Sequence, residues 1–288
     1  MISVIIPALN EEAAIVDTVS RAKAVLRELG ADGGEVIVIN DGSRDNTGIQ
    51  AANAGATVIN HPHNAGYGRS LKSGILAAKN EILVITDSDG TYPIERISDL
   101  YAEYQKGFDM VVGARTGANY DESFKKKILR LILKNMVEFT AGRKIDDINS
   151  GLRMFSRTSV LKYMDTLCDT FSFTTSLTLA YMMTGRFVKY IPIEYHKRVG
   201  KTNVRLFRDT LRTLQYIVEA ILYYNPIKIF IVLSFFTLIF SVLNFGLAFF
   251  LNFNTFFWLG VRSVFLSILI FSICIVAVLF KQILMNEK

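Results

Sequence analysis

Two carboxylates one residue apart indicate chemistry on a diphosphate. Asp87 and Asp89 come directly after the apolar residues 82–86, a run that predicts a buried strand. Carboxylates placed together at the end of a strand can share a hard divalent cation such as Mg²⁺ or Mn²⁺. The cation would bridge the two phosphates of a nucleoside diphosphate and neutralise the charge that grows as this group leaves. We therefore expect Asp87 and Asp89 to be metal ligands and catalytic residues.

Two other polar segments also stand at the ends of predicted strands. Residues 7–12 (PALNEE) follow one β-branched run, and residues 40–43 (NDGS) complete another. Ligands of open α/β sheets bind beyond the carboxyl ends of the strands, and Asp41 can accept hydrogen bonds there from a nucleobase imide or a ribose. Taken singly, each segment also fits a helix N-terminus or a capped turn. Together with the two carboxylates, they favour a nucleotide-binding edge.

The elements that must position these residues alternate between strand and helix. Strands are predicted at residues 3–6, 35–40, 57–60, 82–86 and 109–113, and helices at residues 11–29, 45–54, 69–79 and 92–106. Such alternation is typical of a mostly parallel sheet with helices on both faces. We therefore predict an α/β fold in which the polar segments meet at adjacent strand ends.

The C-terminal part has the composition of a membrane protein. Of the 288 residues, 51% are hydrophobic and only 20% are charged. Residues 227–251 and 256–280 are almost free of charge, and a transmembrane helix needs about 20 apolar residues. Both are predicted to span a membrane, and a buried core helix is the weaker interpretation. Residues 123–141 and 205–225 are basic and amphipathic, which suits helices at a membrane interface or helices packed on the sheet.

The net charge of +6 indicates an anionic partner. The basic residues lie beside apolar stretches, which favours a membrane surface over nucleic acid. Most Lys and Arg lie on the side of the main domain, so the positive-inside rule places this domain in the cytoplasm. No signal-peptide pattern is seen at the N-terminus, and Cys168 and Cys274 fit no metal or disulfide spacing. We expect an integral membrane protein, and polar residues between its spans would permit a homo-oligomer.

The three strand-end motifs, in this order and at these intervals, resemble the family 2 glycosyltransferases of the GT-A fold. Residues 64–74 (NAGYGRSLKSG) are also similar to the family's Gly-rich stretch, and the resemblance covers about residues 1–205. It implies a Rossmann-like GT-A catalytic domain over residues 1–204, then a juxtamembrane helix over 205–225 and two spans within 226–288. The residues implied to hold the nucleoside and its diphosphate are Pro7, Leu9, Glu11, Asp41 and Asp87, and those implied to bind the metal are Asp87 and Asp89.

Within this family the chain looks most like the polyprenyl-phosphate glycosyltransferases, such as dolichol-phosphate mannose synthases and undecaprenyl-phosphate glucosyltransferases. The shared features are Gly113-Ala114-Arg115 at a strand end, the basic helix 123–141, the D-x-x-S-G-F-R-like residues 147–153, the R-x-x-G-x-S-K-like loop from Arg198, and the two spans. The resemblance implies transfer of a hexose from a UDP- or GDP-hexose to dolichyl or undecaprenyl phosphate, with inversion.

An acceptor phosphate is already anionic, so it needs cations that hold it near the donor more than it needs a strong base. A guanidinium can hold phosphate in a bidentate way. The candidates for the acceptor phosphate are Arg115, Lys127, Arg130 and Arg198, although each also fits an ordinary surface cation. The candidates for orienting the sugar, or for orienting one another, are Asp147, Ser150 and Arg153.

Three positions depart from the family pattern. Thr91 stands where the family has a metal-site Gln, and Asn203 stands where its acceptor loop often ends in Lys. Gly151 occupies the place at which some relatives carry an Asp proposed as a base. The donor sugar therefore stays open between glucose, mannose, an N-acetylhexosamine and a pentose.

Two other functions fit parts of the sequence. A processive polysaccharide synthase of the same superfamily would usually carry a Q-x-x-R-W-type segment and more spans, but Trp258 within the second span is the only tryptophan. A non-catalytic membrane scaffold with a nucleotide-binding domain would not require the intact pair Asp87 and Asp89.

Overall fold

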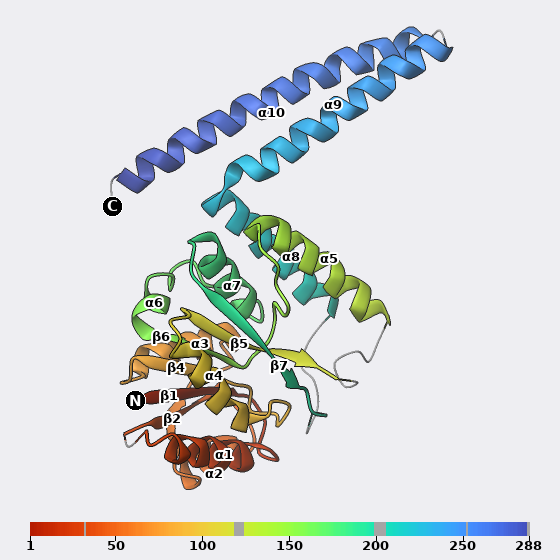
Figure 1. The fold of residues 1–288 in the computed structure, drawn as a ribbon. Coiled ribbons are helices and arrows are strands. Elements are labelled where there is room, and N and C mark those ends of the chain that lie inside the picture. The colour runs from red at the N-terminus through yellow and green to blue at the C-terminus, as the bar shows by residue number, and fades with distance from the viewer. Residues whose placement is uncertain (32, 118–123, 199–205, 252, 287–288) are drawn as a thin grey trace. The chain divides into compact units, whose positions relative to one another are not determined.

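The computed structural model describes residues 1–31, 33–117, 124–198, 206–251 and 253–286 (Figure 1). The chain divides into two units, Met1–Ile217 and Val218–Lys288. The first unit contains a seven-stranded sheet with its covering helices, and the second contains two long apolar helices.

The sheet has the strand order β3-β2-β1-β4-β6-β5-β7. Its strands are β1 (Ile2–Ala8), β2 (Glu35–Asn40), β3 (Thr57–Asn60), β4 (Ile82–Ile85), β5 (Met110–Thr116), β6 (Arg153–Ser156) and β7 (Val188–Glu194). All pair in parallel except β6, which runs antiparallel to both β4 and β5. The expected α/β fold with a mostly parallel sheet is confirmed.

Helices cover both faces of the sheet (Figure 1). The helices of this unit are α1 (Ile15–Glu28), α2 (Thr47–Asn53), α3 (Tyr67–Ala77), η1 (Ile94–Arg96), α4 (Ile97–Tyr104), α5 (Phe124–Ala141), α6 (Arg157–Leu161) and α7 (Phe173–Met183), and α8 (Leu206–Tyr224) follows. In β1, Val4 and Ile6 join the core formed with α1 and α4, whereas Ile5 lies against Gly74 of α3. This period-two alternation explains why β1 is apolar throughout, since a strand buried on both faces has no polar side.

The predicted strands and helices of the first 116 residues are found with small changes in their ends. The strand predicted at 109–113 continues to Thr116, so Arg115 lies within β5. The helix predicted at 92–106 is shorter and begins with the single turn η1 after Pro93, whose backbone is extended. The elements β6, α6, α7 and β7 had no counterpart among the predicted ones, and they complete the sheet on the side of β5.

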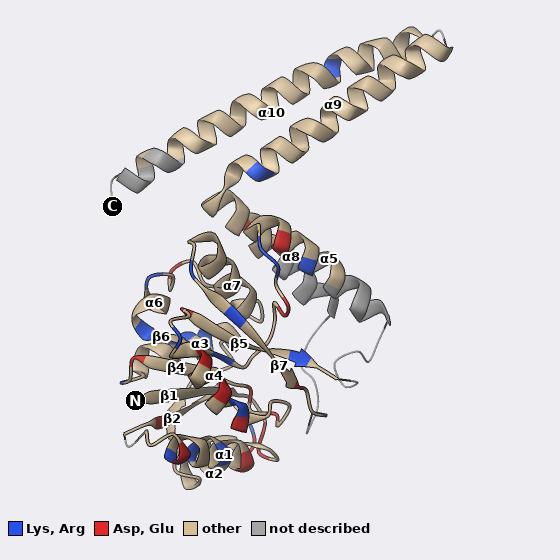
Figure 2. Cartoon of the chain, viewed as in Figure 1, with Lys and Arg blue, Asp and Glu red and all other residues tan. Residues whose placement is uncertain are grey.

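The second unit contains α9 (Pro226–Leu251) and α10 (Asn254–Asn286). Both are long and apolar enough to cross a membrane, and Figure 2 shows them almost without charge in their described part. Their polar side chains meet each other: Ser234 and Ser267 join their hydroxyls at 2.7 Å, and Ser241 donates to the carbonyl of Gly260. Hydrogen bonds between transmembrane helices contribute about 0.6 kcal/mol each. These serines bond within one chain, and the homo-oligomer stays a prediction.

Candidate active site

One cavity lies at the carboxyl ends of β1, β2 and β4. It measures about 390 Å³, a volume typical of small-molecule sites. The predicted site residues among its lining are Pro7, Leu9, Glu11, Asp41, Asp87, Asp89 and Arg198. The expectation that the three strand-end motifs share one edge of the sheet is therefore confirmed by the geometry.

Two loops are joined at the side of this cavity where the nucleoside is expected. Asn10 donates its backbone N–H to Ser43 Oγ (3.0 Å), and its side chain accepts the N–H of Arg44 (2.8 Å). Glu11 donates its N–H to Thr47 Oγ1 (2.8 Å). Asn10 is the one described non-glycine residue with positive φ, at 56°, a conformation that Asn tolerates better than most residues. The loop after β1 is thus held in place by the loop after β2.

Asp41 is buried at the end of β2 and is held by three donors. Its Oδ1 contacts His61 Nδ1 at 2.7 Å and accepts the N–H of Ala65 at 2.9 Å. Its Oδ2 accepts the N–H of Gly66 at 2.9 Å. Gly66 has φ 106°, which side chains disfavour, and this geometry points its N–H at the carboxylate. Asp41 therefore fixes the Gly-rich loop against the cavity.

Asp87 lies half-buried at the end of β4 and accepts a hydrogen bond from the Tyr67 hydroxyl at 2.8 Å. Burial raises the pKa of Asp87, and the negative charge of Asp89 raises it further, to about 7. Gly151 lies directly against it: a Cβ at this position would stand 2.7 Å from Asp87 Oδ2. The position at which some relatives carry an Asp thus faces the first carboxylate of the pair.

Asp89 is buried and is oriented by Thr91. Both the N–H and the hydroxyl of Thr91 donate to Asp89 Oδ1, at 3.1 and 2.5 Å. Asp89 Oδ2 lies 3.4 Å from Nη1 of Arg198. Thr91, which replaces the family's Gln, therefore positions the second carboxylate by hydrogen bonding to it.

Asp87 and Asp89 fit a hard divalent cation. Burial is the first cause that raises the pKa of Asp87, and the negative charge of Asp89 is the second, so the two carboxylates repel each other. Oxygen ligands from one or two carboxylates, completed by water and substrate phosphates, are what Mg²⁺ usually takes. No cluster of three or more His, Cys, Asp or Glu suited to a metal occurs in the described part of the chain. The donor set therefore suits a cation that the substrate helps to bind.

Arg198 joins two of the strand ends. Its Nη2 donates to Glu11 Oε1 at 2.5 Å, while Nη1 pairs with Asp89. Burial raises the pKa of Glu11, and the charge of Arg198 opposes this rise. Since Glu11 follows β1 and Asp89 follows β4, one guanidinium spans the cavity at the place where anionic groups of a ligand would lie.

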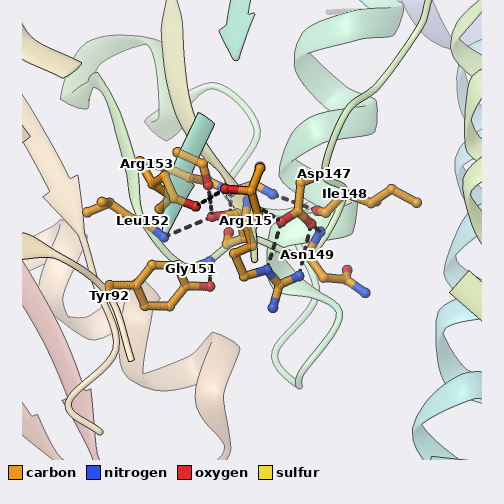
Figure 3. A network of polar contacts seen from close by, with 12 residues as sticks. Tyr92, Arg115, Asp147, Ile148, Asn149, Gly151, Leu152 and Arg153 are labelled. Atoms are coloured by element: carbon orange, nitrogen blue, oxygen red, sulfur yellow. Dashed lines mark hydrogen bonds and ion pairs between the residues drawn. The ribbon is translucent and has the colours of Figure 1, made fainter. Parts of the chain in front are cut away.

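Arg115 and Asp147 form a second, more buried ion pair (Figure 3). Arg115 donates from Nε and Nη2 to the two oxygens of Asp147, at 2.7 and 2.9 Å, and its backbone N–H donates at 3.1 Å. Burial would raise the pKa of Asp147, but Arg115 outweighs this effect and lowers it. Asp147 thus contacts Arg115 and not Arg153, and neither member of the pair is among the residues that line the cavity.

Arg153 supports the loop that carries Asp147 and Gly151 (Figure 3), and Ser150 within this loop bonds to β5. Arg153 is fully buried on β6 and donates to the carbonyls of Ser150 and Ile148 and to the Thr178 hydroxyl. The hydroxyl of Ser150 donates to the carbonyl of Gly113. Burial lowers the pKa of Arg153. Both residues are expected to influence a bound sugar only through the loop that they hold.

Some site residues were not predicted. Tyr67, Thr170 and Phe171 form a wall of the cavity, and the rings of Tyr67 and Phe171 lie 6.2 Å apart. Tyr67 was named only as part of the Gly-rich stretch 64–74. No sequence pattern indicated that residues 170 and 171 would line the site. Among the predicted residues, Lys127 and Arg130 fall within α5, but their side chains lie outside the described residues, as do residues 199–205 of the acceptor loop.

Comparison with known proteins decides the family. The profile of glycosyl transferase family 2 matches residues 3–164, which is more than half of the chain. The chain belongs to glycosyl transferase family 2. As a member of family 2, it shares the fold of glucosyl-3-phosphoglycerate synthase from Mycobacterium tuberculosis, with a TM-score of 0.61 at 20% identity over 76% of this chain and 79% of that one.

Three curated proteins have sequences similar to that of this family 2 chain. The hexosyltransferase Agl6 of low-salt glycan biosynthesis in Haloferax volcanii is 28% identical over 75% of this chain and 52% of its own length. The undecaprenyl-phosphate 4-deoxy-4-formamido-L-arabinose transferase of Pseudomonas fluorescens is 31% identical, over 55% and 48%. The dolichyl-phosphate hexose transferase of Haloferax volcanii is 27% identical, over 72% and 87%. The chain thus spans about half the length of the first two.

Proposed function

We propose that this chain transfers a hexose from a nucleotide-diphospho-sugar to a polyprenyl phosphate at the cytoplasmic face of a membrane. The observation that carries the proposal is that Asp41, Asp87, Asp89 and Arg198 line one cavity at adjacent strand ends. Relatives named for transfer to undecaprenyl or dolichyl phosphate support it, as do the two helices that are apolar enough to span a membrane.

The donor would lie along the strand ends with its diphosphate at Asp87 and Asp89. These carboxylates would hold Mg²⁺ or Mn²⁺, and the bound cation would neutralise charge on the leaving nucleoside diphosphate. Tyr67 and Thr91 keep the two carboxylates oriented. Such fixed groups cost little reorganisation during the reaction, so this chain's own contribution is a preorganised pair of carboxylates that would hold the cation.

The acceptor phosphate would meet arginine side chains. Arg198 lines the cavity and can exchange its carboxylate partners for phosphate oxygens, since guanidinium binds either in a bidentate way. Arg115 is held by Asp147 and would offer its charge from a fixed position. Lys127 and Arg130 of the basic helix are proposed to contribute to the same phosphate.

The reaction would be a direct displacement with inversion. A phosphate oxygen of the acceptor bonds to the anomeric carbon as the bond from that carbon to the diphosphate breaks. Because the acceptor enters as an anion, no proton has to be removed by a base. Gly151, which brings no carboxylate to this region, is consistent with such a mechanism.

The membrane setting completes the proposal. The helices α9 and α10 would anchor the protein, and the basic, amphipathic residues of α5 and α8 would lie at the height of the lipid phosphate. The positive-inside rule supports a cytoplasmic catalytic domain. A homo-oligomer stays a prediction.

The proposal is tested with the full-length protein in native membranes. Labelled UDP- and GDP-hexoses are supplied with undecaprenyl or dolichyl phosphate and Mg²⁺ or Mn²⁺. The expected result is label in an organic-extractable, mild-acid-labile lipid. Asp89→Asn should reduce transfer at least about a hundredfold while the protein stays folded and membrane-bound.

Asp99→Asn is the matched control, because Asp99 of α4 forms an exposed ion pair with Arg96 of η1 and should leave transfer unchanged. A labelled polymer in place of the lipid would favour a processive synthase. Absence of product with every donor would favour a non-catalytic scaffold, and full activity of Asp89→Asn would reject the metal role.

A further inference from the structure

Thr91 lies between Asp89 and a third side chain, the phenol of Tyr195. The N–H and the hydroxyl of Thr91 both donate to Oδ1 of Asp89. A hydroxyl has one proton to donate and two lone pairs that accept, so the Thr91 hydroxyl is left as an acceptor. The side chain of Tyr195 hydrogen-bonds to that of Thr91, and burial raises the pKa of Tyr195, so its phenol keeps the proton that it donates. Tyr195 is thus connected to Asp89 through one side chain.

The connection determines which oxygen of Asp89 faces a cation. Oδ1 accepts both donors of Thr91, whereas Oδ2 lies 3.4 Å from Nη1 of Arg198. A divalent cation would therefore meet Oδ2. Hydrogen bonds in a chain polarise one another, so the donation from Tyr195 strengthens the bond that keeps Oδ1 in place.

The backbone around Tyr195 is fixed on two sides. Tyr195 follows β7, and its N–H donates to the carbonyl of Thr116 at the end of β5 (3.0 Å). The N–H of the next residue, His196, donates to the carbonyl of Thr91 (2.9 Å). The ring is half-buried and packs edge-on against Tyr92, with centroids 5.4 Å apart and planes at 76°. Tyr195 is therefore held against both β5 and the loop after β4.

The ring of Tyr195 also lies under the guanidinium of Arg115. Cζ of Arg115 is 5.4 Å from the ring centroid, within the distance at which a cation is attracted to the face of an aromatic ring. Asp147 holds the same guanidinium through two hydrogen bonds. A carboxylate and an aromatic ring thus fix Arg115 together.

We propose that Tyr195 is a positioning residue for both substrates, because its hydroxyl orients Asp89 through Thr91 and its ring holds Arg115. The inference rests on the proposed function, in which Asp89 meets the divalent cation of the donor and Arg115 meets the acceptor phosphate. Tyr195 is not among the residues that line the cavity, so it acts through these neighbours and not by touching a ligand.

The first test measures Mn²⁺ binding to the purified full-length protein in lipid nanodiscs, without nucleotide or acceptor, by electron paramagnetic resonance of free Mn²⁺. Tyr195→Phe removes the hydroxyl and keeps the ring, and it should weaken Mn²⁺ binding about fivefold, the effect of one neutral hydrogen bond. Thr91→Val keeps the N–H and should weaken binding at least as much. The double variant should bind Mn²⁺ no more weakly than Thr91→Val, because the connection is already broken.

Tyr163→Phe is the matched control for the loss of a phenol. It removes another tyrosine hydroxyl that bonds to a threonine, at 2.8 Å from Thr184 Oγ1, and neither residue lines the cavity. Mn²⁺ binding should be unchanged in this variant. Wild-type Mn²⁺ binding in Tyr195→Phe would overturn the role of the hydroxyl. Losses that multiply in the double variant would overturn its action through Thr91.

The second test separates the ring from the hydroxyl by steady-state transfer at saturating Mn²⁺. Tyr195→Leu removes both, so its apparent KM for polyprenyl phosphate should be at least about threefold above that of Tyr195→Phe. The KM for the nucleotide sugar should differ little between the two variants. Equal lipid KM values would overturn the role of the ring. If Tyr195→Leu does not fold, Tyr195→Met removes the ring with a more adaptable side chain.

The outcomes separate this inference from the proposed function. Formation of the lipid product with wild-type Mn²⁺ binding and wild-type lipid KM in the Tyr195 variants would overturn the inference and leave lipid transfer standing. Absence of any lipid product would overturn lipid transfer, and the role of the ring with it. The Mn²⁺ titrations need no acceptor and would still decide the role of the hydroxyl.

Discussion

Arg198 and Asp89 form an ion pair across the cavity, with Nη1 of Arg198 3.4 Å from Oδ2 of Asp89. The same guanidinium holds Glu11 through Nη2. A cation from the segment after β7 thus neutralises acids at the ends of β1 and β4, where the donor diphosphate and its divalent cation are proposed to bind. Since a guanidinium and a metal ion compete for one carboxylate, the proposed donor site requires Arg198 to change partners when the donor binds.

Replacing Arg198 should therefore have opposite effects on metal binding and on transfer. In Arg198→Ala, Mn²⁺ binding without nucleotide should become tighter, because Asp89 loses a competing cation. Transfer should fall at least about tenfold, since a charged hydrogen bond to phosphate is lost. Electron paramagnetic resonance measures free Mn²⁺, and Arg21→Ala, which breaks an exposed pair with Glu95, is the control. Weaker Mn²⁺ binding would contradict competition between the two cations.

The pKa of Asp87 predicts a pH-dependent stability in the absence of metal. Its value of about 7 lies above the ordinary value of about 3.9, so the folded state binds this proton more tightly than the unfolded chain. The contribution to stability is complete below about pH 4 and is lost as pH rises through about 7. With a chelator, the Tm of wild type relative to Asp87→Asn should fall from pH 5.5 to pH 8. Mg²⁺ should stabilise wild type more at pH 8, because a protonated Asp87 is a poor ligand, and an equal effect at both pH values would refute this.

The ends of these strands were predictable, because a strand that is buried on both faces is a continuous run of apolar residues in the sequence. The runs before Asn40 and Asp87 are continuous and β-branched, since both faces of a parallel sheet are covered. The antiparallel β6 (RMFS) lacked such a signal, because its apolar residues Met154 and Phe155 stand between the buried Arg153 and Ser156. Because arginine is mostly found at the surface, the sequence does not indicate that an arginine is buried and donates to carbonyl groups.

The pairing of charges was the part that sequence could not supply. Arg115 and Asp147 were each assigned to a ligand, but the fold joins them to each other. The position of a residue along a strand indicates at which edge of the sheet its side chain lies. Its partner depends on which distant loop packs against that edge, and the sequence does not indicate this. For the same reason Tyr67 could be placed near the site, but its hydrogen bond to Asp87 could not be foreseen.

Because Gly151 lies so close to Asp87, we predict that adding one methyl group at position 151 reduces transfer. In Gly151→Ala the new Cβ would lie 2.7 Å from Asp87 Oδ2, so the carboxylate must leave its bond with Tyr67 or the loop must move. Overpacking of this kind costs about 1–3 kcal/mol. Transfer should fall at least about tenfold at fixed Mn²⁺ and recover partly at higher Mn²⁺. Gly246→Ala is the control, because no atom lies within 4 Å of its Cβ position and its φ is not positive; wild-type transfer by Gly151→Ala would show that Asp87 can move without loss.

Replacing Arg115 should lower the stability of the fold and weaken the binding of the acceptor lipid, and the double variant with Asp147→Ala separates these two effects. Arg115→Ala leaves the buried Asp147 charge uncompensated, which costs about 3 kcal/mol and lowers Tm by about 6–12 °C. Adding Asp147→Ala should recover at least half of this loss, because the unpaired charge is then gone. The apparent KM for polyprenyl phosphate should rise more than that for the nucleotide sugar in Arg115→Ala, and should stay high in the double variant. If the lipid KM recovers together with stability, Arg115 only supports the fold, and Arg198 is the cationic side chain that lines the cavity among the described residues.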